Sequence, residues 1–428
     1  MNLGDDAAAA SYHRHSVPTV LILGASVSQL AAIEQAKAGG WRVVAVDADP
    51  NAVGLAAADI AEVVDFSELE LVVDIGRRHQ IDAVVAISTD RAVPIAAAVA
   101  ERLNLPTIGT ETARVMTDKA AMRNRLQECG IPQPQFSVLN GKVEPTWGLE
   151  SVGVPAVLKP VDSGGQRGVY RISDHADLAR YLPDAIAQSR SKRAILERYV
   201  DGHELNGIIV VRSGEPVLLT FSDRLRPPGI GFGVGWIHLY PSQLPKSHLD
   251  AAADIAIRAV RALGLKDGIA FPQLLVTDTG EAFVVEVAAR IPAGQMADLV
   301  RLGTGIDLVE IALAQGRGAA VTDAMIQPHF QRPLAIRFLT ASPGILPTGT
   351  VTAVEGLDRV REATGVLEAG LYIQPGETIR PVQVDADRRG YIIATADNPL
   401  AALELAQQAS LKLRMRVTKA HDGRRAAA

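Results

Sequence analysis

Residues 154–170 read Val-Pro-Ala-Val-Leu-Lys-Pro-Val-Asp-Ser-Gly-Gly-Gln-Arg-Gly-Val-Tyr. A short apolar run ends in Lys159, and the loop that follows contains Ser163 and then Gly164, Gly165 and Gly168. Glycine tolerates positive φ and close approach, so successive backbone N–H groups of such a loop can converge on an anion. A lysine held on the preceding strand adds a positive charge. The stretch therefore predicts a clamp for the phosphates of a nucleotide.

The same residues allow a simpler interpretation. Strand-like runs at 156–158 and 169–172 flank the glycines, so the segment can also be a plain β-hairpin with a glycine-rich turn. A Walker loop is excluded, because the lysine precedes the glycines and no Gly-Lys-Ser/Thr opens a helix after them. The rest of the sequence is needed to distinguish a phosphate clamp from a plain β-hairpin.

Composition limits the classes of protein to consider. The 428 residues, 48% hydrophobic, suffice for about two to four domains. A single cysteine, Cys129, excludes an intramolecular disulfide and predicts a reducing, cytoplasmic location. The net charge of −5 at pH 7 and the 4% aromatic content argue against nucleic acid as a partner. No apolar run approaches the roughly 18 residues of a membrane span, so no membrane partner is expected.

The first part of the chain alternates strands and helices. We expect strands at 19–23, 41–46 and 83–87 and helices at 28–38 and 68–79. This alternation predicts a doubly wound parallel sheet, placed at residues 18–110, after a disordered tail at 1–17. The turn after the first strand has Ser26 and Gln29 where a dinucleotide fingerprint needs glycine, which disfavours NAD binding.

Residues 116–132 predict a helix with clear ends. Thr117 or Asp118 caps it, Lys119 lies in its first turn, and Gly130 ends it. A lysine is unfavourable at the positive end of the helix dipole, so Lys119 is either functional or a solvated surface residue.

Two glutamates flank a short extended segment after the glycine loop. Between Glu197 and Glu204, the backbone of Tyr199 and Val200 can pair with the edge of an adenine, and Glu204 can accept from ribose hydroxyls. The alternative is a pair of exposed strand glutamates, the commoner fate of this residue type.

Residues 221–245 are rich in glycine and proline and contain Arg224, Arg226 and His238. We expect a long loop without secondary structure that borders the substrate. A hairpin of strands at 269–276 and 281–287 follows, with Gln273 and Glu286 on adjacent strands. Oxygen ligands on rigid strands suit a magnesium ion.

In their order, these features resemble the ATP-grasp superfamily of carboxylate–amine ligases, in the branch of biotin carboxylase and carbamoyl phosphate synthetase. The resemblance covers about residues 19–417. It implies an α/β and α+β fold: a Rossmann-like domain at 18–110, a two-lobed ATP-grasp domain at 111–330 with its glycine-loop lobe at about 135–200, and a small α+β lid at 331–417. We expect residues 418–428 to fray.

The resemblance also implies roles for the residues. ATP binds through the two lysines, the loop and the hinge, Mg²⁺ (with Mn²⁺ as the alternative ion) binds at the hairpin, and an arginine four residues after Glu286 holds the substrate carboxylate. Two departures from the family are Gln273, where an acidic residue is usual, and Ala288, where the metal-binding asparagine of a Glu-x-Asn pair is missing. The implied nucleotide residues are Lys119, Lys159, Ser163, Gly164, Gly165, Gly168, Glu197, Tyr199, Val200 and Glu204, the metal ligands Gln273 and Glu286, and the substrate residues Arg290, Arg224 and His238, with Arg290 and Lys159 as the catalytic ones.

The resemblance implies a ligase that activates a carboxylate, such as that of an amino acid, as an acyl phosphate. An amine then displaces phosphate, and ADP is released. Three alternatives stay open: a carboxylase that uses bicarbonate through carboxyphosphate, a non-catalytic nucleotide-binding regulator, and an NAD-dependent oxidoreductase. The expected partners are a small carboxylate and an amine, and a homodimer is left open.

Overall fold

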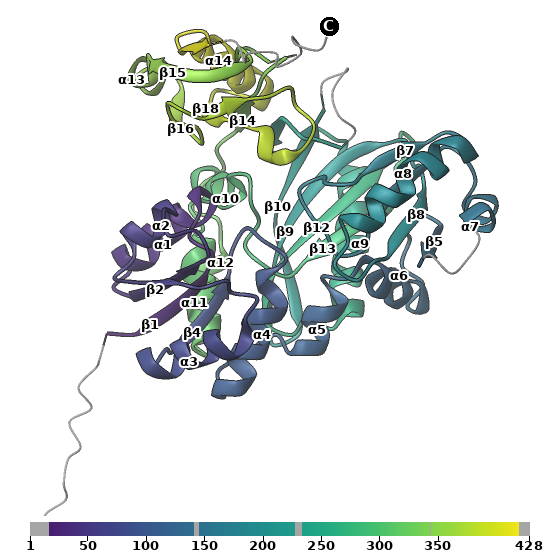
Figure 1. The fold of residues 1–428 in the computed structure, drawn as a ribbon, viewed down its shortest axis with the longest axis horizontal. Coiled ribbons are helices and arrows are strands. Elements are labelled where there is room, and N and C mark those ends of the chain that lie inside the picture. The colour runs from purple at the N-terminus through teal and green to yellow at the C-terminus, as the bar shows by residue number, and fades with distance from the viewer. Residues whose placement is uncertain (1–16, 141–144, 227–232, 343, 419–428) are drawn as a thin grey trace, which may run out of the picture.

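The computed structural model describes residues 17–140, 145–226, 233–342 and 344–418. Figure 1 shows the N-terminal region in purple on one side of a set of long strands, the glycine-loop lobe on the other, and the C-terminal region above them. Of the predicted tails at 1–17 and 418–428, residues 1–16 and 419–428 lie outside the described residues, and Thr418 belongs to a strand. Within the described ranges, no helix combines the length and apolarity needed to cross a membrane.

The N-terminal region forms a parallel sheet in the order β3-β2-β1-β4. Helices cover both faces of this sheet, which explains why β1 is buried at every position. The predicted doubly wound sheet is therefore confirmed. Its elements are β1 (Thr19–Leu23), α1 (Val27–Ala38), β2 (Arg42–Asp47), α2 (Val53–Ala57), β3 (Ile60–Val63), α3 (Leu69–His79), β4 (Ala83–Ala86) and α4 (Ala92–Leu103).

The turn after β1 is closed by its own side chains. Gln29 is 3% exposed and donates a hydrogen bond from Nε2 to the carbonyl of Ile87 at 2.9 Å. Ser26 donates to Gln29 Oε1 at 2.6 Å. The Gln29 amide lies 3.4 Å from the place of a Cβ on Gly24, so a side chain lies against the turn where a dinucleotide needs free backbone.

The glycine-loop lobe contains an antiparallel sheet in the order β5-β8-β6-β7. β6 and β7 are neighbours, so the glycine loop does connect a β-hairpin, as the simpler interpretation held. The elements of this part are α5 (Thr110–Val115), α6 (Lys119–Glu128), β5 (Phe136–Leu139), α7 (Pro145–Val152), β6 (Ala156–Pro160), β7 (Tyr170–Ile172), α8 (His175–Ala187) and β8 (Ala194–Arg198).

An eight-stranded sheet runs through the molecule in the order β13-β12-β9-β10-β11-β14-β18-β16. One face packs on the N-terminal region and the other on α9. Its elements up to β14 are β9 (His203–Arg212), β10 (Glu215–Leu225), β11 (Ile237–Tyr240), α9 (Lys246–Leu263), β12 (Gly268–Val276), β13 (Ala282–Ala288), α10 (Met296–Thr304), α11 (Leu308–Gly316), α12 (Asp323–Ile326) and β14 (Leu334–Leu339).

The expectation of a loop without secondary structure at 221–245 is wrong. β10 extends to Leu225 and β11 begins at Ile237, and the two strands pair directly, with Arg224 opposite His238. Phe221 and its neighbours continue a strand that pairs with β9 from Glu215 onward. Every glycine of this range and two of its four prolines lie in the connection between the strands, of which residues 227–232 lie outside the described ranges, whereas Pro241 and Pro245 follow β11.

The C-terminal region adds a second, three-stranded sheet in the order β17-β15-β19. Strands β18 and β16 join β14 in the large sheet, so the region is continuous with the central one. Its elements are β15 (Gly349–Glu355), α13 (Leu357–Arg361), β16 (Val366–Leu371), β17 (Thr378–Ile379), the 3₁₀ turn η1 (Asp385–Asp387), β18 (Gly390–Thr395), α14 (Pro399–Ser410) and β19 (Arg414–Thr418).

Candidate active site

One cavity between the glycine-loop lobe and the large sheet collects most of the predicted nucleotide and metal residues. We call it the nucleotide cleft. Its lining brings together side chains from α6, the hairpin loop, β8, β9, β12 and β13, elements far apart in the sequence. The predicted residues that line it are Lys119, Lys159, Ser163, Gly164, Gly165, Glu197, Tyr199, Val200, Glu204, Gln273 and Glu286.

Gly168 does not line the nucleotide cleft. Its φ is +68°, and a Cβ there would lie 3.0 Å from Pro160. Gly168 therefore allows the loop to turn back onto β6, a structural contribution to the hairpin.

Lys119 is the first residue of α6 and is buried at 8% exposure. Its Nζ lies 2.8 Å from Glu286 Oε1 and donates to the carbonyl of Ser163 at 3.0 Å. Burial by itself would lower the pKa of Lys119, but Glu286 and then Asp90 outweigh this and raise it. The interpretation of Lys119 as a solvated surface lysine is wrong, because α6 begins at the wall of the cleft and the lysine is buried there. The side chain of Asp118, the residue before it, caps the backbone of α6.

Glu197 lies between two buried cations. Its Oε2 is 2.8 Å from Lys159 Nζ, and its Oε1 accepts from Arg123 Nε at 2.8 Å. Burial would raise the pKa of Glu197, but Arg123 and Lys159 together lower it to about 2. Glu197 is therefore no exposed strand glutamate: it is an ionised buried group that fixes the ammonium of Lys159.

Arg123 was not predicted from the sequence. It is 1% exposed and donates to the carbonyls of Val284 at 2.8 Å and Val285 at 2.6 Å, which ties α6 to β13. The signal was present, since Arg123 follows Lys119 by four residues and so lies on the same face of the helix.

The pKa of Lys159 is lowered by its surroundings. Burial is the largest influence on its pKa and lowers it, and the nearby Arg123 and Lys119 add to this, while Glu197 opposes it. A buried cation with cationic neighbours is compensated when an anion binds. The cleft is thus electrostatically suited to phosphate.

Glu204, on β9, is paired in this structure with two arginines. Its carboxylate accepts from Arg224 and from Arg226. Arg224 also donates from Nη2 to the carbonyl of Gly233 at 2.6 Å. Tyr199 and Val200 lie in the irregular segment between β8 and β9, and the Tyr199 N–H already donates to Pro155 at 2.9 Å.

Three oxygen-bearing side chains lie in one row across the large sheet. Gln273 on β12 is opposite Glu286 on β13 and opposite Asn206 on β9. Among the described residues, no group of three or more His, Cys, Asp and Glu side chains is arranged to hold a metal. One carboxylate with neighbouring amide oxygens nevertheless fits Mg²⁺, which takes few protein ligands and fills its coordination with phosphate and water. Asn206, missed from the sequence, adds a second amide oxygen to this row.

A second, larger cavity of about 970 Å³ adjoins the nucleotide cleft, and we call it the substrate cavity. Arg290 and His238 line it, together with residues of the N-terminal and C-terminal regions. Arg290 Nε donates to Asp90 Oδ1 at 2.7 Å, an ion pair that the sequence did not predict. Burial would raise the pKa of Asp90, but Arg290 and Lys119 outweigh it and lower the pKa.

His238 is 4% exposed and lies edge-on to Phe338, with ring centroids 5.9 Å apart. Burial, followed by the positive charges of Arg388 and Arg224, lowers the pKa of His238 well below its ordinary value. The imidazole is therefore neutral at physiological pH.

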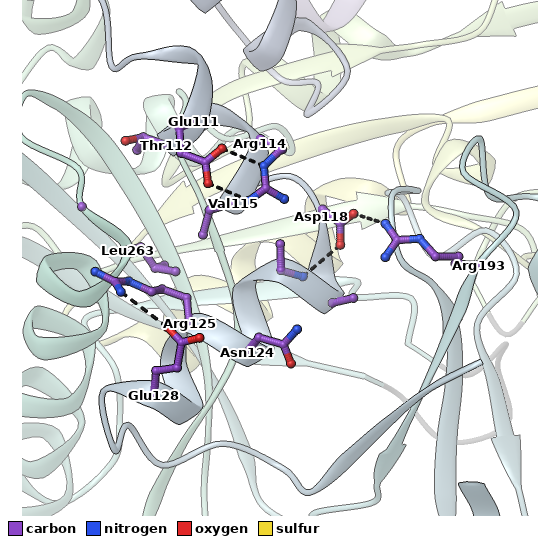
Figure 2. A pocket seen from close by; sticks show the side chains of 13 residues that line it. Glu111, Thr112, Arg114, Val115, Asp118, Asn124, Arg125, Glu128, Arg193 and Leu263 are labelled. Atoms are coloured by element: carbon purple, nitrogen blue, oxygen red, sulfur yellow. Dashed lines mark hydrogen bonds and ion pairs between the residues drawn. The ribbon is translucent and has the colours of Figure 1, made fainter. Parts of the chain in front are cut away.

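A further pocket, shown in Figure 2, lies beside α5, α6 and the end of α9. Its side chains include the exposed ion pairs Arg114–Glu111 and Arg125–Glu128. None of the predicted site residues lines it. It is separate from the chemistry assigned to the nucleotide cleft.

Comparison with known proteins agrees with this geometry. A family model described as "ATP-grasp domain" matches residues 152–298. The chain carries an ATP-grasp domain. A second model, "L-amino acid ligase C-terminal domain 2", matches residues 337–418. These matches confirm the predicted resemblance and indicate an enzyme of the ATP-grasp carboxylate–amine ligase type.

Individual relatives are similar to this chain over most of its length. A formate-dependent phosphoribosylglycinamide formyltransferase from Ignicoccus hospitalis is 26% identical over 385 residues, 87% of this chain and 89% of the relative. The fold is similar to an L-amino acid ligase from Bacillus licheniformis, with a TM-score of 0.79, 21% identity, and coverage of 94% of this chain and 99% of that one. It is also similar to a biotin carboxylase from Campylobacter jejuni, with a TM-score of 0.74, 18% identity, and coverage of 94% and 93%.

Proposed function

We propose that this ligase joins the carboxylate of an amino acid to an amine through an acyl-phosphate intermediate. The observation that carries the proposal is that the nucleotide cleft and the substrate cavity share part of their lining, including Gly164, Gln273 and Glu286. A carboxylate in the substrate cavity thus meets the terminal phosphate of ATP at this shared wall. The match of residues 337–418 to an L-amino acid ligase domain supports an amino acid as the substrate.

ATP occupies the nucleotide cleft in this proposal. Lys119, Lys159 and the backbone N–H groups of the glycine loop hold the phosphates. Because the Tyr199 N–H is bonded to Pro155, the adenine edge pairs with the backbone near Val200. Glu204 accepts from the ribose when its arginine partners release it.

Glu286 and Gln273 would hold Mg²⁺, or Mn²⁺ as the alternative, with Asn206 as a further oxygen donor. The bound ion supplies neutralisation of negative charge on the phosphates during transfer. Lys119 stays within 2.8 Å of Glu286 and keeps this carboxylate ionised and oriented.

The chemistry proceeds in two steps. An oxygen of the substrate carboxylate, placed by Arg290, attacks the γ-phosphorus, and the bond from that phosphorus to the bridging oxygen breaks, so ADP leaves. The amine then attacks the acyl carbon, the carbon–oxygen bond to phosphate breaks, and inorganic phosphate leaves as the amide forms. Asp90 accepts from Nε of Arg290 and the carbonyl of Ile291 accepts from its Nη1 at 3.4 Å, so the anion is held through Nη2.

The size of the substrate cavity disfavours the carboxylase alternative. Bicarbonate needs a pocket for one small anion, whereas about 970 Å³ accommodates an amino acid together with an amine. The single cysteine, Cys129, supports a cytoplasmic location for such an enzyme.

The test is a screen of ADP release with pairs of amino acids and amines, followed by mass spectrometry of the products. We expect ADP release that requires both substrates and a product equal to their sum minus water. ADP release with bicarbonate alone would favour the carboxylase, and tight ATP binding without turnover on any pair would favour a regulator.

A further inference from the structure

A third cavity adjoins the substrate cavity and has no role in the mechanism above. It measures about 580 Å³ and is lined by β4, by α4, by α11 and by the start of β12. Figure 1 shows α4 and α11 next to β4. We call it the edge cavity, because β4 is an edge strand of the parallel sheet. A cavity of this size accommodates a small organic molecule.

The edge of β4 turns a backbone donor and a backbone acceptor outward. Gly24, the residue after β1, donates its N–H to Val46 on β2, so the even-numbered positions of β1 face β2 and the odd-numbered ones face β4. Leu21 is the register partner of Val84 and therefore bonds to the residues on either side of it. The N–H and C=O of Val84, which lines the edge cavity, thus point away from the sheet.

The end of the same edge supports this direction. Ser88 donates its N–H to the carbonyl of Ile291 at 2.9 Å, and Ile87 forms a parallel bridge with Ile291. Among the described residues, the outer edge is therefore paired near Ser88, whereas no strand lies beside Val84. An unpaired strand edge readily accepts a further donor and acceptor.

The rest of the lining is apolar or already neutralised. Arg212, at the end of β9, donates to the carbonyl of Val321 at 3.2 Å and pairs with Asp323. Asp267 accepts from the N–H of Ser213 at 2.8 Å. Because these charged groups have partners in the protein, the cavity favours a neutral ligand. The small residues that α4 and α11 contribute are Ala96, Ala97, Ala100, Ala312 and Gly316.

One stretch of chain separates the edge cavity from the substrate cavity. Arg290 and Ile291 line both cavities. The residues that hold this stretch follow β4 directly: Ser88 donates to Ile291, and Asp90 accepts from Nε of Arg290 at 2.7 Å. A ligand paired with Val84 therefore lies on the strand whose end positions Arg290.

We propose that the edge cavity is a regulatory site for a small neutral ligand with an apolar body and an adjacent N–H and C=O pair, as in a primary amide or a lactam. The amide donates to the carbonyl of Val84 and accepts from its N–H. Its effect on the reaction passes along β4 to Arg290. This coupling rests on the proposed function, whereas the binding site does not.

The binding test uses the full-length protein and 4-fluorobenzamide, observed by fluorine NMR. We expect a dissociation constant of about millimolar, as for a fragment of this size. The N,N-dimethyl derivative, which has no N–H, should bind about 2–10-fold more weakly. The charged analogue 4-fluorobenzoate should bind at least about tenfold more weakly, because its carboxylate loses its hydration.

A pair of variants on α11 controls for the site. Ala312→Leu fills part of the edge cavity and should abolish binding of 4-fluorobenzamide. Ala314→Leu makes the same change on the same helix outside the lining, and it should bind as wild type does. Thermal melting of both variants shows that each is folded.

Hydrogen exchange and kinetics then report where the ligand lies and what it does. At a probe concentration of about ten times the dissociation constant, exchange of the Val84 N–H should slow by about tenfold in wild type and in Ala314→Leu, and not in Ala312→Leu. In the ADP-release assay, the probe should change KM for the amino acid donor by at least about fivefold and leave KM for ATP unchanged.

The outcomes separate the alternatives. The site is wrongly assigned if wild type does not bind 4-fluorobenzamide, if the dimethyl derivative binds equally well, if 4-fluorobenzoate binds more tightly, or if Ala312→Leu binds as wild type does. Binding and protection without a change in KM for the donor would keep the site and contradict its coupling to Arg290. Binding by a protein that releases no ADP with any donor would contradict the proposed function, and the coupling with it, but support the ligand site.

Discussion

Glu197→Gln removes one negative charge from the centre of the nucleotide cleft with little change of shape. In the native protein, this carboxylate lies 2.8 Å from Lys159 Nζ and 2.8 Å from Arg123 Nε. The substitution leaves two buried cations without their anion. A buried pair broken by removal of one partner is strongly destabilising, because the other charge remains desolvated.

The size of the effect follows from the ionisation of Glu197. Burial would raise its pKa, but Arg123 and Lys159 outweigh burial and lower it from 4.5 to about 2. That difference corresponds to about 3 kcal/mol in favour of the ionised carboxylate. Glutamine resembles the protonated group, so we expect the variant to lose about 3 kcal/mol in the free energy of unfolding at pH 7.

The sign of the pH dependence follows as well. A depressed folded-state pKa gives stabilisation that is complete above about 4.5 and is lost as the pH falls toward about 2. The stability curves of wild type and Glu197→Gln should therefore converge in this acidic window.

The assay is urea unfolding followed by tryptophan fluorescence, at pH 7 and at decreasing pH. The matched control is Glu128→Gln, whose carboxylate is 66% exposed and 3.5 Å from Arg125, and which should cost less than about 1 kcal/mol. If Glu197→Gln is no less stable than this control at pH 7, or if its deficit is the same at every pH, the assigned charge network is wrong.

Three further predictions concern the reaction. Lys159→Ala and Glu286→Ala should each lower ADP formation by about 10²–10³-fold with the fold retained, measured by a coupled ADP assay, and wild-type rates would place the site elsewhere. Arg290→Lys should lower substrate-dependent ADP release steeply and leave ATP affinity by calorimetry nearly unchanged, whereas a loss of ATP binding would move Arg290 to the nucleotide site. ATP binding should take up protons at alkaline pH, because burial lowers the pKa of Lys159 in the free enzyme and the bound phosphate raises that pKa again. Calorimetry in buffers of different ionisation enthalpy measures the number of protons taken up. Proton release on ATP binding would contradict the prediction.

Much of the fold could be predicted because its strands are apolar runs with clear ends. The strand Thr19–Leu23 begins and ends where the sequence predicts. The failure at 221–245 has a physical cause: glycine and proline between β10 and β11 obscured two strands, of which β10 pairs with the preceding β9 and β11 with the distant β14. Strand β11 is stabilised by β14, almost a hundred residues later, and no local pattern reports that pairing.

The residues of the site likewise fall into two groups, those with a local signal in the sequence and those whose partners are distant in it. Lys159 before its glycines and Glu286 on its hairpin have a local signal, and both line the nucleotide cleft. Asp90 was missed because its partner Arg290 is 200 residues away, although its place just beyond a parallel strand was a usable signal. Asn206 could have been found from the alternation of strand residues, since it follows Glu204 by two positions on β9.

Isotope transfer shows whether a substrate carboxylate attacks ATP and becomes an acyl phosphate. The donor amino acid is labelled with a heavy oxygen isotope in its carboxylate, the enzyme turns it over with an acceptor, and the inorganic phosphate is analysed by mass spectrometry. We expect one labelled oxygen in each phosphate released, in step with the formation of the condensed product. Unlabelled phosphate accompanied by condensed product would contradict it.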